Sequence, residues 1–288
     1  MQHHNNSFSH HQDEQLSRED PGNYNKSAGG RADSDFLDVK GSDGINDPAL
    51  LTQSSKIKFI PLDDLEPLEN PEKEFKKAMA KNQGVYCSEW FEQFEACNII
   101  RRVCKYHQKF IIQTGNQLNT LVVVLLKLVE SLRSAVSRIA LITLTEMFST
   151  LKRVMEPCLD QVMKIVLKKG ADANNFISDE ADRCLQSLVS NCQENKVLMV
   201  IQMQNLNSRS NMIRLKLCQC LFSIVKSLGN NILFFKDNDK LIIQLAKYLQ
   251  DASQDVRQTA KNSFIVMSQT IMGQNDLEKL LQRVLNEF

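Results

Sequence analysis

The chain has 288 residues, of which 42% are hydrophobic and 24% are charged, and its formal net charge is only +1. Six basic and 13 acidic residues lie in residues 1–71, so this segment carries a net charge of −7 and the remainder carries +8. A chain of this size forms either one large domain or an array of repeats. The basic remainder either attracts an acidic partner at long range or is an ordinary solvated surface.

The cysteines and the apolar runs narrow the class of protein. Eight cysteines stand singly in segments expected to be helical, with no Cys-x-x-Cys pair and no signal peptide before them. This usage is typical of small buried residues in a reducing compartment. Cys218 and Cys220 diverge on a helix, which argues against a metal site there. The longest apolar run, residues 121–126, is far shorter than the roughly 20 residues of a membrane span. We therefore expect a soluble intracellular protein without a membrane span.

The beginning of the chain differs from the rest. Residues 1–70 are predicted to be a disordered acidic leader, because Gly, Ser, Asn and Asp dominate and apolar side chains are sparse. Two pairs of histidines near the start are expected to be bystanders rather than a metal site. A more apolar stretch, Ile57–Leu68, either lies back on the folded part, docks into a partner or is a plain linker.

From Pro71 onward, apolar residues recur at spacings of three and four, which predicts helices and no strand. In the stretch Leu132–Met147, a short polar turn leads into a helix whose apolar face is expected to comprise Val136, Ile139, Ala140, Thr143, Leu144 and Met147. The unit is two helices joined by this turn, 115–130 and 134–150. The same unit is expected at 71–82 with 90–103, 157–169 with 176–189, 195–206 with 211–228 and 240–249 with 254–271, followed by a single helix at 276–288.

The helical pairs are repeats of one another. A small or apolar residue two turns into each second helix recurs at intervals of 44, 41, 36 and 43 residues, at Ala96, Ala140, Ala181, Leu217 and Ala260. This is the period of HEAT repeats, in which the turns inside the pairs line up along one edge. The predicted fold class is therefore all-α, a HEAT-repeat (armadillo-type) α-solenoid of five helical pairs plus a closing helix. It forms one domain, residues 71–288.

The sequence contains no catalytic or metal-binding constellation. His107 is the only histidine after the leader and is expected at a helix end, where a cation is favourable. The chain has no Gly-rich phosphate loop, no His-Glu-x-x-His and no Cys/His metal spacing. Basic pairs such as Arg101-Arg102 lack interleaved aromatic residues, which favours solvated helix ends over a nucleic-acid site. We expect neither an enzyme nor a nucleic-acid binder, and no cofactor.

The turns resemble those of one particular kind of HEAT domain. Ser88–Ala96 is similar to the start of a TOG domain, where a tryptophan stands at the first turn. Leu132–Ala140 is similar to its second turn, Asn174–Ile177 to its third and Asp251–Arg257 to its fifth. Residues 71–288 thus resemble the TOG domains of the CLASP and crescerin group, most closely those of the TOG array regulators of axonemal microtubules.

This resemblance implies a non-enzymatic microtubule-associated protein that binds αβ-tubulin or microtubules through the turns along one edge. It implies the cytoplasm and cytoskeleton, including cilia or axonemes, as the location. In that family the tryptophan packs on β-tubulin, and basic or polar residues of later turns contact the acidic tubulin surface. Carried over by position, the tubulin-binding candidates are Trp90, Ser134, Ser137, Arg138, Asn174, Asn175, Arg209, Arg257 and Lys261.

Several alternatives stay open on the residues alone. Trp90 suits an exposed interface anchor or the core of the first repeat. Arg257 suits a partner contact or a bond to the neighbouring repeat. The sequence departs from the family where Phe91, Glu92 and Gln93 follow the tryptophan in place of a basic residue, which weakens contact with an acidic partner. The alternative function is a HEAT-repeat scaffold that has lost tubulin binding and binds another protein.

Overall fold

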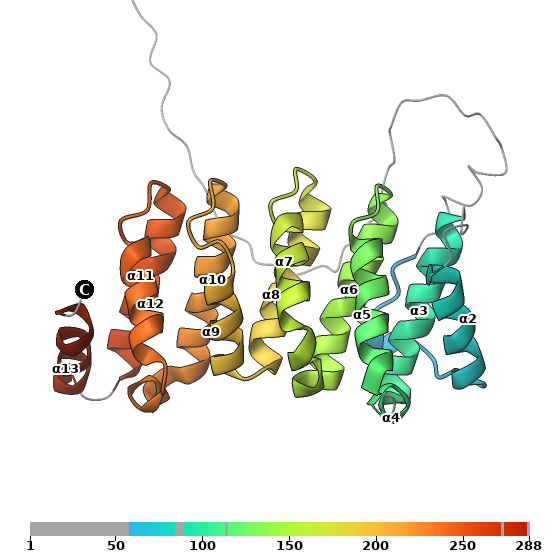
Figure 1. Ribbon diagram of the computed structural model, residues 1–288, viewed down its shortest axis with the longest axis horizontal. Helices are drawn as coiled ribbons and strands as arrows, with labels where there is room; N and C mark the ends of the chain where they lie inside the picture. Colours follow the sequence, from blue (N-terminus) through green and yellow to red (C-terminus); the bar gives the residue numbers. More distant parts are fainter. Residues whose placement is uncertain (1–57, 84–88, 113–114, 272–273, 287–288) are drawn as a thin grey trace, which may run out of the picture. The chain divides into compact units, whose positions relative to one another are not determined.

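The structure, a computed structural model, describes residues 58–83, 89–112, 115–271 and 274–286 (Figure 1). The folded unit runs from Ile57 to Phe288. All regular elements in the described ranges are helices. The predicted disorder of the leader lies outside these ranges, apart from its last 13 residues.

Five helical pairs and a closing helix follow one another among the described residues, as the apolar spacing predicted. The pairs are α2 (Pro71–Gln83) with α3 (Trp90–Tyr106), α5 (Gly115–Val129) with α6 (Ser134–Leu151), α7 (Leu159–Lys169) with α8 (Asn175–Asn191), α9 (Glu194–Met203) with α10 (Asn211–Leu228), and α11 (Asn238–Tyr248) with α12 (Gln254–Thr270). The closing helix is α13 (Gln274–Leu285). Shorter elements are η1 (Leu62–Asp64), α4 (Gln108–Ile112), η2 (Lys152–Cys158) and η3 (Gly229–Phe234).

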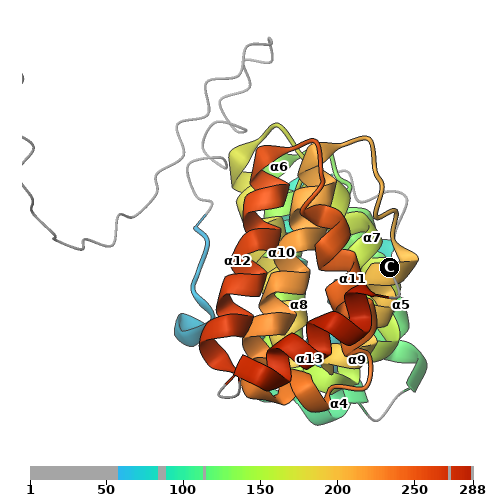
Figure 2. The same cartoon turned by 90° about the vertical axis from the view of Figure 1, so that its left-hand side faces the viewer.

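The helices of the folded unit form two layers. The second helices of the pairs, α3, α6, α8, α10 and α12, stack on one another in sequence order, and the first helices form the other layer (Figures 1 and 2). The turns inside the second to fifth pairs lie along the upper edge in Figure 1, and the connections between pairs lie along the lower edge. This arrangement is the HEAT-repeat α-solenoid that the sequence predicts.

The buried residues confirm the predicted repeat register. The residue that recurs two turns into each second helix is at most 1% exposed in all five repeats: Ala96, Ala140, Ala181, Leu217 and Ala260. Small side chains at four of these positions let adjacent helices approach closely. The apolar face expected for α6 is also fully buried, from Val136 to Met147. The hydrophobic periodicity alone thus located the core.

Residues 58–70, which include η1, lie across α3 and α6, and we call this segment the N-terminal strap. Its Phe59 ring meets the Phe94 ring edge-on at 5.3 Å, and Leu65 is only 3% exposed. The Lys105 ammonium donates to the Leu62 carbonyl at 2.8 Å. Of the alternatives left open for Ile57–Leu68, the structure shows packing on the body for the described part, residues 58–68. The folded unit therefore begins before Pro71, because the strap buries apolar side chains and its carbonyls are hydrogen-bonded.

The structure bears on two sequence expectations, the absence of a membrane span and the burial of the cysteines. The segment Asn211–Phe234 is apolar and long enough to cross a membrane by length and composition. In the folded unit, however, its Leu217, Leu221 and Ile224 are fully buried among neighbouring helices. The described cysteines are all free and buried, and the described residues hold no group of three or more side chains suited to a metal ion.

Candidate functional site

The turns inside the helical pairs form the candidate site, which we call the turn edge. It consists of residues 130–133, 170–174, 204–210 and 249–253 together with the first residues of the helices that follow them. The turn of the first pair, residues 84–88, lies outside the described residues. The chain enters each second helix at this edge, where backbone N–H groups lack helical partners.

In the second and third repeats, a serine at the same position of the second helix forms a hydrogen bond to the preceding turn. Ser137 donates a hydrogen bond from its hydroxyl to the Val129 carbonyl at 2.7 Å, and Ser178 donates to the Gly170 carbonyl at 2.8 Å. Each serine stands three residues before the buried register alanine and bonds a carbonyl eight residues earlier. The Ser137 side chain is only 1% exposed. Ser137 therefore holds its turn and is not available at the surface, which corrects its place among the candidates.

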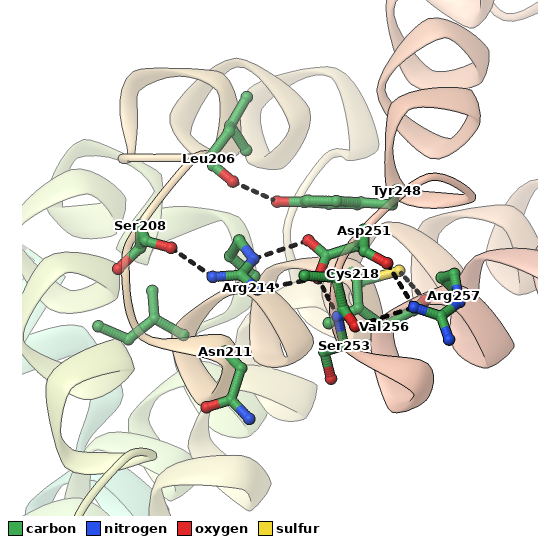
Figure 3. A network of polar contacts seen from close by, with 12 residues as sticks. Leu206, Ser208, Asn211, Arg214, Cys218, Tyr248, Asp251, Ser253, Val256 and Arg257 are labelled. Carbon is green, nitrogen blue, oxygen red and sulfur yellow. Dashed lines mark hydrogen bonds and ion pairs between the residues drawn. The ribbon is translucent and has the colours of Figure 1, made fainter.

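Arginine takes the place of serine in the fourth and fifth repeats. Arg214 Nη1 donates to the Ser208 carbonyl at 2.6 Å, and Arg257 Nη1 donates to the carbonyls of Asp251 at 2.6 Å and Ala252 at 2.9 Å (Figure 3). The longer side chain reaches the turn from the same register position. The alternative that Arg257 bonds the neighbouring repeat is wrong, because its guanidinium bonds the turn of its own repeat.

A partly buried ion pair joins the fourth and fifth turns. Arg214 donates two hydrogen bonds to the Asp251 carboxylate, from Nε at 2.7 Å and from Nη2 at 2.9 Å (Figure 3). The Arg214 guanidinium and the Ser253 backbone N–H hold the pKa of Asp251 below its usual value, because both stabilise the ionised carboxylate. Tyr248 adds a hydrogen bond from its hydroxyl to the Leu206 carbonyl at 3.2 Å. These contacts link the fourth turn directly to the fifth.

Arg138 links three parts of the folded unit. Its Nε lies 3.2 Å from Glu180 Oε1, and its guanidinium lies over the rings of Phe59 at 4.4 Å and Phe176 at 5.7 Å. The Arg138 side chain is 15% exposed and that of Glu180 is 5% exposed. Glu180 also pairs with Arg183. Arg138 thus connects the strap, the second repeat and the third repeat, and it shares the Glu180 carboxylate with Arg183.

The remaining candidates reach the surface to different degrees. Trp90 begins α3, where it is partly buried against the core and meets Phe91 edge-on at 6.0 Å. Asn174 is exposed, and its side chain accepts a hydrogen bond from the Phe176 backbone N–H at 3.0 Å, capping α8. Lys261 is exposed two turns into α12, away from the turn itself. Exposed at the turns are Ser134, Asn175 and Arg209.

Sequence reasoning missed the exposed apolar residues of this edge. Leu132, at the tip of the second turn, is 103% exposed, Phe176 is 47% exposed and Met212 is 37% exposed. Sequence reasoning treated these turns as polar and selected only polar, basic and tryptophan side chains as candidates. The repeat register could have located two of them, because Phe176 and Met212 both stand five residues before the register residue of their helix.

The fold and the turn edge define a class of protein, the TOG domain. A solved structure concerning crescerin and its use of a TOG domain array to regulate microtubules in the primary cilium matches with a TM-score of 0.53 and 19% identity, over 79% of this chain and 88% of that one. Another, concerning TOG–tubulin binding specificity, matches with a TM-score of 0.51 and 16% identity, over 80% and 94% of the two chains. At these identities the likeness establishes the fold alone.

The sequence places the chain in a family. The family model described as CLASP N terminal matches residues 88–286, so the chain belongs to the CLASP N-terminal family. The chain is 26% identical over 200 residues to TOG array regulator of axonemal microtubules protein 1 of Mus musculus. That match covers 68% of this chain and 11% of the relative.

Proposed function

We propose that the chain is a non-enzymatic microtubule-associated protein that binds αβ-tubulin through its turn edge and acts in the cytoskeleton, at cilia or axonemes. One observation carries this proposal. The same register position, occupied by Ser137, Ser178, Arg214 or Arg257, bonds the carbonyls of four successive turns. The turns are thus held in fixed conformations along one edge, and a pre-ordered surface loses little entropy on binding.

The candidate residues fall into two groups. Ser137 and Arg257 bond the carbonyls of their own turns, and Arg138 pairs with Glu180 of α8, so all three use polar atoms inside the fold. The residues proposed to contact tubulin are Trp90, Ser134, Asn174, Asn175 and Arg209, with Lys261 at the margin of the surface. Membership of the CLASP N-terminal family and the likeness to named microtubule regulators support this assignment.

Size-exclusion chromatography of the full chain with αβ-tubulin at low salt tests the proposal. We expect a complex of the wild-type chain, and a weaker one for Trp90→Ala combined with Arg209→Ala, because large aromatic and arginine side chains are typical interface anchors. Arg153→Ala is the matched control, since Arg153 is exposed in η2 on the opposite edge. Thermal unfolding of each variant separates lost binding from lost folding. Wild-type chain that elutes apart from tubulin contradicts the proposal.

A groove between α8 and α10 favours the second candidate function, a scaffold for another protein. It has a volume of about 310 Å³ and lies between Gln186 of α8 and Lys226 of α10, with Leu185 and Phe222 among its apolar lining. Lys216 in its wall is paired with Asp182. If tubulin binding fails at low salt, this groove becomes the surface to examine for a protein partner.

A further inference from the structure

We infer that the turn edge binds tubulin mainly through apolar side chains, Leu132, Phe176 and Met212, with the basic residues contributing orientation rather than most of the affinity. This inference rests on the proposed function and specifies the chemistry of the same site. The partner surface it requires has apolar depressions, one for each of three successive turns. Three sets of observations support it.

The first observation is the exposure of Leu132 on a fixed turn. A single exposed leucine is ordinary on a protein surface, but this side chain is 103% exposed, at the tip of the second turn. The turn that carries Leu132 is held by its own hydrogen bonds, from the Ser137 hydroxyl to Val129 and from the Arg133 backbone N–H to the Ser131 hydroxyl at 3.2 Å. Leu132 therefore keeps its apolar surface in water unless a partner covers it.

The second observation is that apolar exposure recurs in the next two repeats. Phe176 is 47% exposed and Met212 is 37% exposed, and both occupy the same position relative to the register residue of their helix. In the first repeat this position is held by Phe91, which is partly buried beside Trp90. Apolar side chains thus stand at the same edge in four consecutive repeats. Repetition along one edge distinguishes this set from scattered surface residues.

The third observation is that the arginines near the edge are largely engaged within the fold. Arg138 pairs with Glu180, Arg214 with Asp251, and Arg257 bonds its own turn. Among the described turns, the guanidinium groups of Arg133 and Arg209 are exposed and form no ion pair with a described residue. Two exposed cations speed and orient the approach of an acidic partner, whereas burial of apolar surface holds the complex together.

Tubulin affinity measured at low salt and at about 0.15 M salt tests the inference. We expect Leu132→Ser with Met212→Ser to weaken binding roughly tenfold or more, by a similar factor at both salt concentrations. Arg133→Ala with Arg209→Ala should weaken binding mainly at low salt and flatten its salt dependence. Phe234→Ser is the matched control, because Phe234 is 82% exposed in η3 on the opposite edge and should be silent.

The outcomes separate the inference from the proposed function. If the wild-type chain binds tubulin, the Leu132/Met212 variant binds equally well and the Arg133/Arg209 variant does not bind, the inference is wrong and the function stands. If the wild-type chain does not bind at either salt concentration, the proposed function fails and the inference falls with it. The single variant Leu132→Ser guards against misfolding, because its fully exposed side chain contributes little to stability.

Discussion

Arg214 and Asp251, 37 residues apart in the chain, form two hydrogen bonds of 2.7 and 2.9 Å that join the fourth and fifth repeats (Figure 3). Their side chains are 14% and 8% exposed. Arg214 also donates to the Ser208 carbonyl of its own turn, so one guanidinium determines how the two turns are spaced along the edge. Breaking this pair tests how strongly the turn edge depends on contacts between repeats.

Asp251→Asn is expected to destabilise the folded unit by about 2–3 kcal/mol at pH 7, because it leaves a largely buried guanidinium without its counter-charge. The pKa of Asp251 is lowered in the folded state, so its contribution is fully present above the unfolded value of about 3.9 and is lost as the pH falls through the folded pKa. Urea unfolding at a series of pH values measures this. If Asp251→Asn is still less stable than the wild type by the same amount below the folded and unfolded pKa values of Asp251, the ionised carboxylate is not the source of the stability.

Deletion of residues 1–56 is expected to leave thermal unfolding of the folded unit unchanged, whereas deletion of residues 1–69 should lower its stability by more than about 3 kcal/mol. The second deletion removes the Ile60 carbonyl, to which Arg101 Nη2 donates at 2.7 Å. Arg101 is only 1% exposed, and after the deletion it keeps the Glu146 carboxylate at 2.6 and 2.7 Å and the Asn98 side-chain oxygen at 3.0 Å but loses its backbone partner.

A point variant provides the matched test of the strap. Leu65→Ala removes a side chain that is 3% exposed and should cost about 2–4 kcal/mol in the full chain. Glu66→Ala, at the next and exposed position, should cost almost nothing. Circular dichroism during heating measures both. Equal melting temperatures for the two variants mean that the strap does not stabilise the folded unit.

The buried thiols are expected to resist a disulfide reagent at pH 8 until the protein unfolds. Burial raises the pKa of five of them to about 12, so they stay protonated far above the pH at which an exposed thiol, with a pKa near 8.5, ionises. The five are Cys97, Cys184, Cys192, Cys218 and Cys220. The measurement uses Cys87→Ser, because Cys87 lies outside the described residues. Rapid reaction of the native variant contradicts the burial of these thiols.

The sequence by itself determined the helices, their pairing and their register. An amphipathic helix shows its apolar face every three or four residues, so the face from Val136 to Met147 and the recurring position at Ala96 and Ala260 are local properties of the chain. The turn residues and the order of the pairs also carry the family resemblance. For this reason the all-α solenoid and its TOG-type turns were predicted without knowledge of any long-range contact.

Only the tertiary structure decided which turn residues are free. Arg138 pairs with Glu180 across 42 residues, Arg214 with Asp251 across 37, and the strap meets Arg101 across 41. These partners come together only when repeats stack, and no local periodicity encodes which charged groups meet across that distance. The stacking engages Arg138 and Arg214 with neighbouring repeats and leaves Leu132 exposed, because a side chain's exposure depends on what packs over it rather than on its residue type.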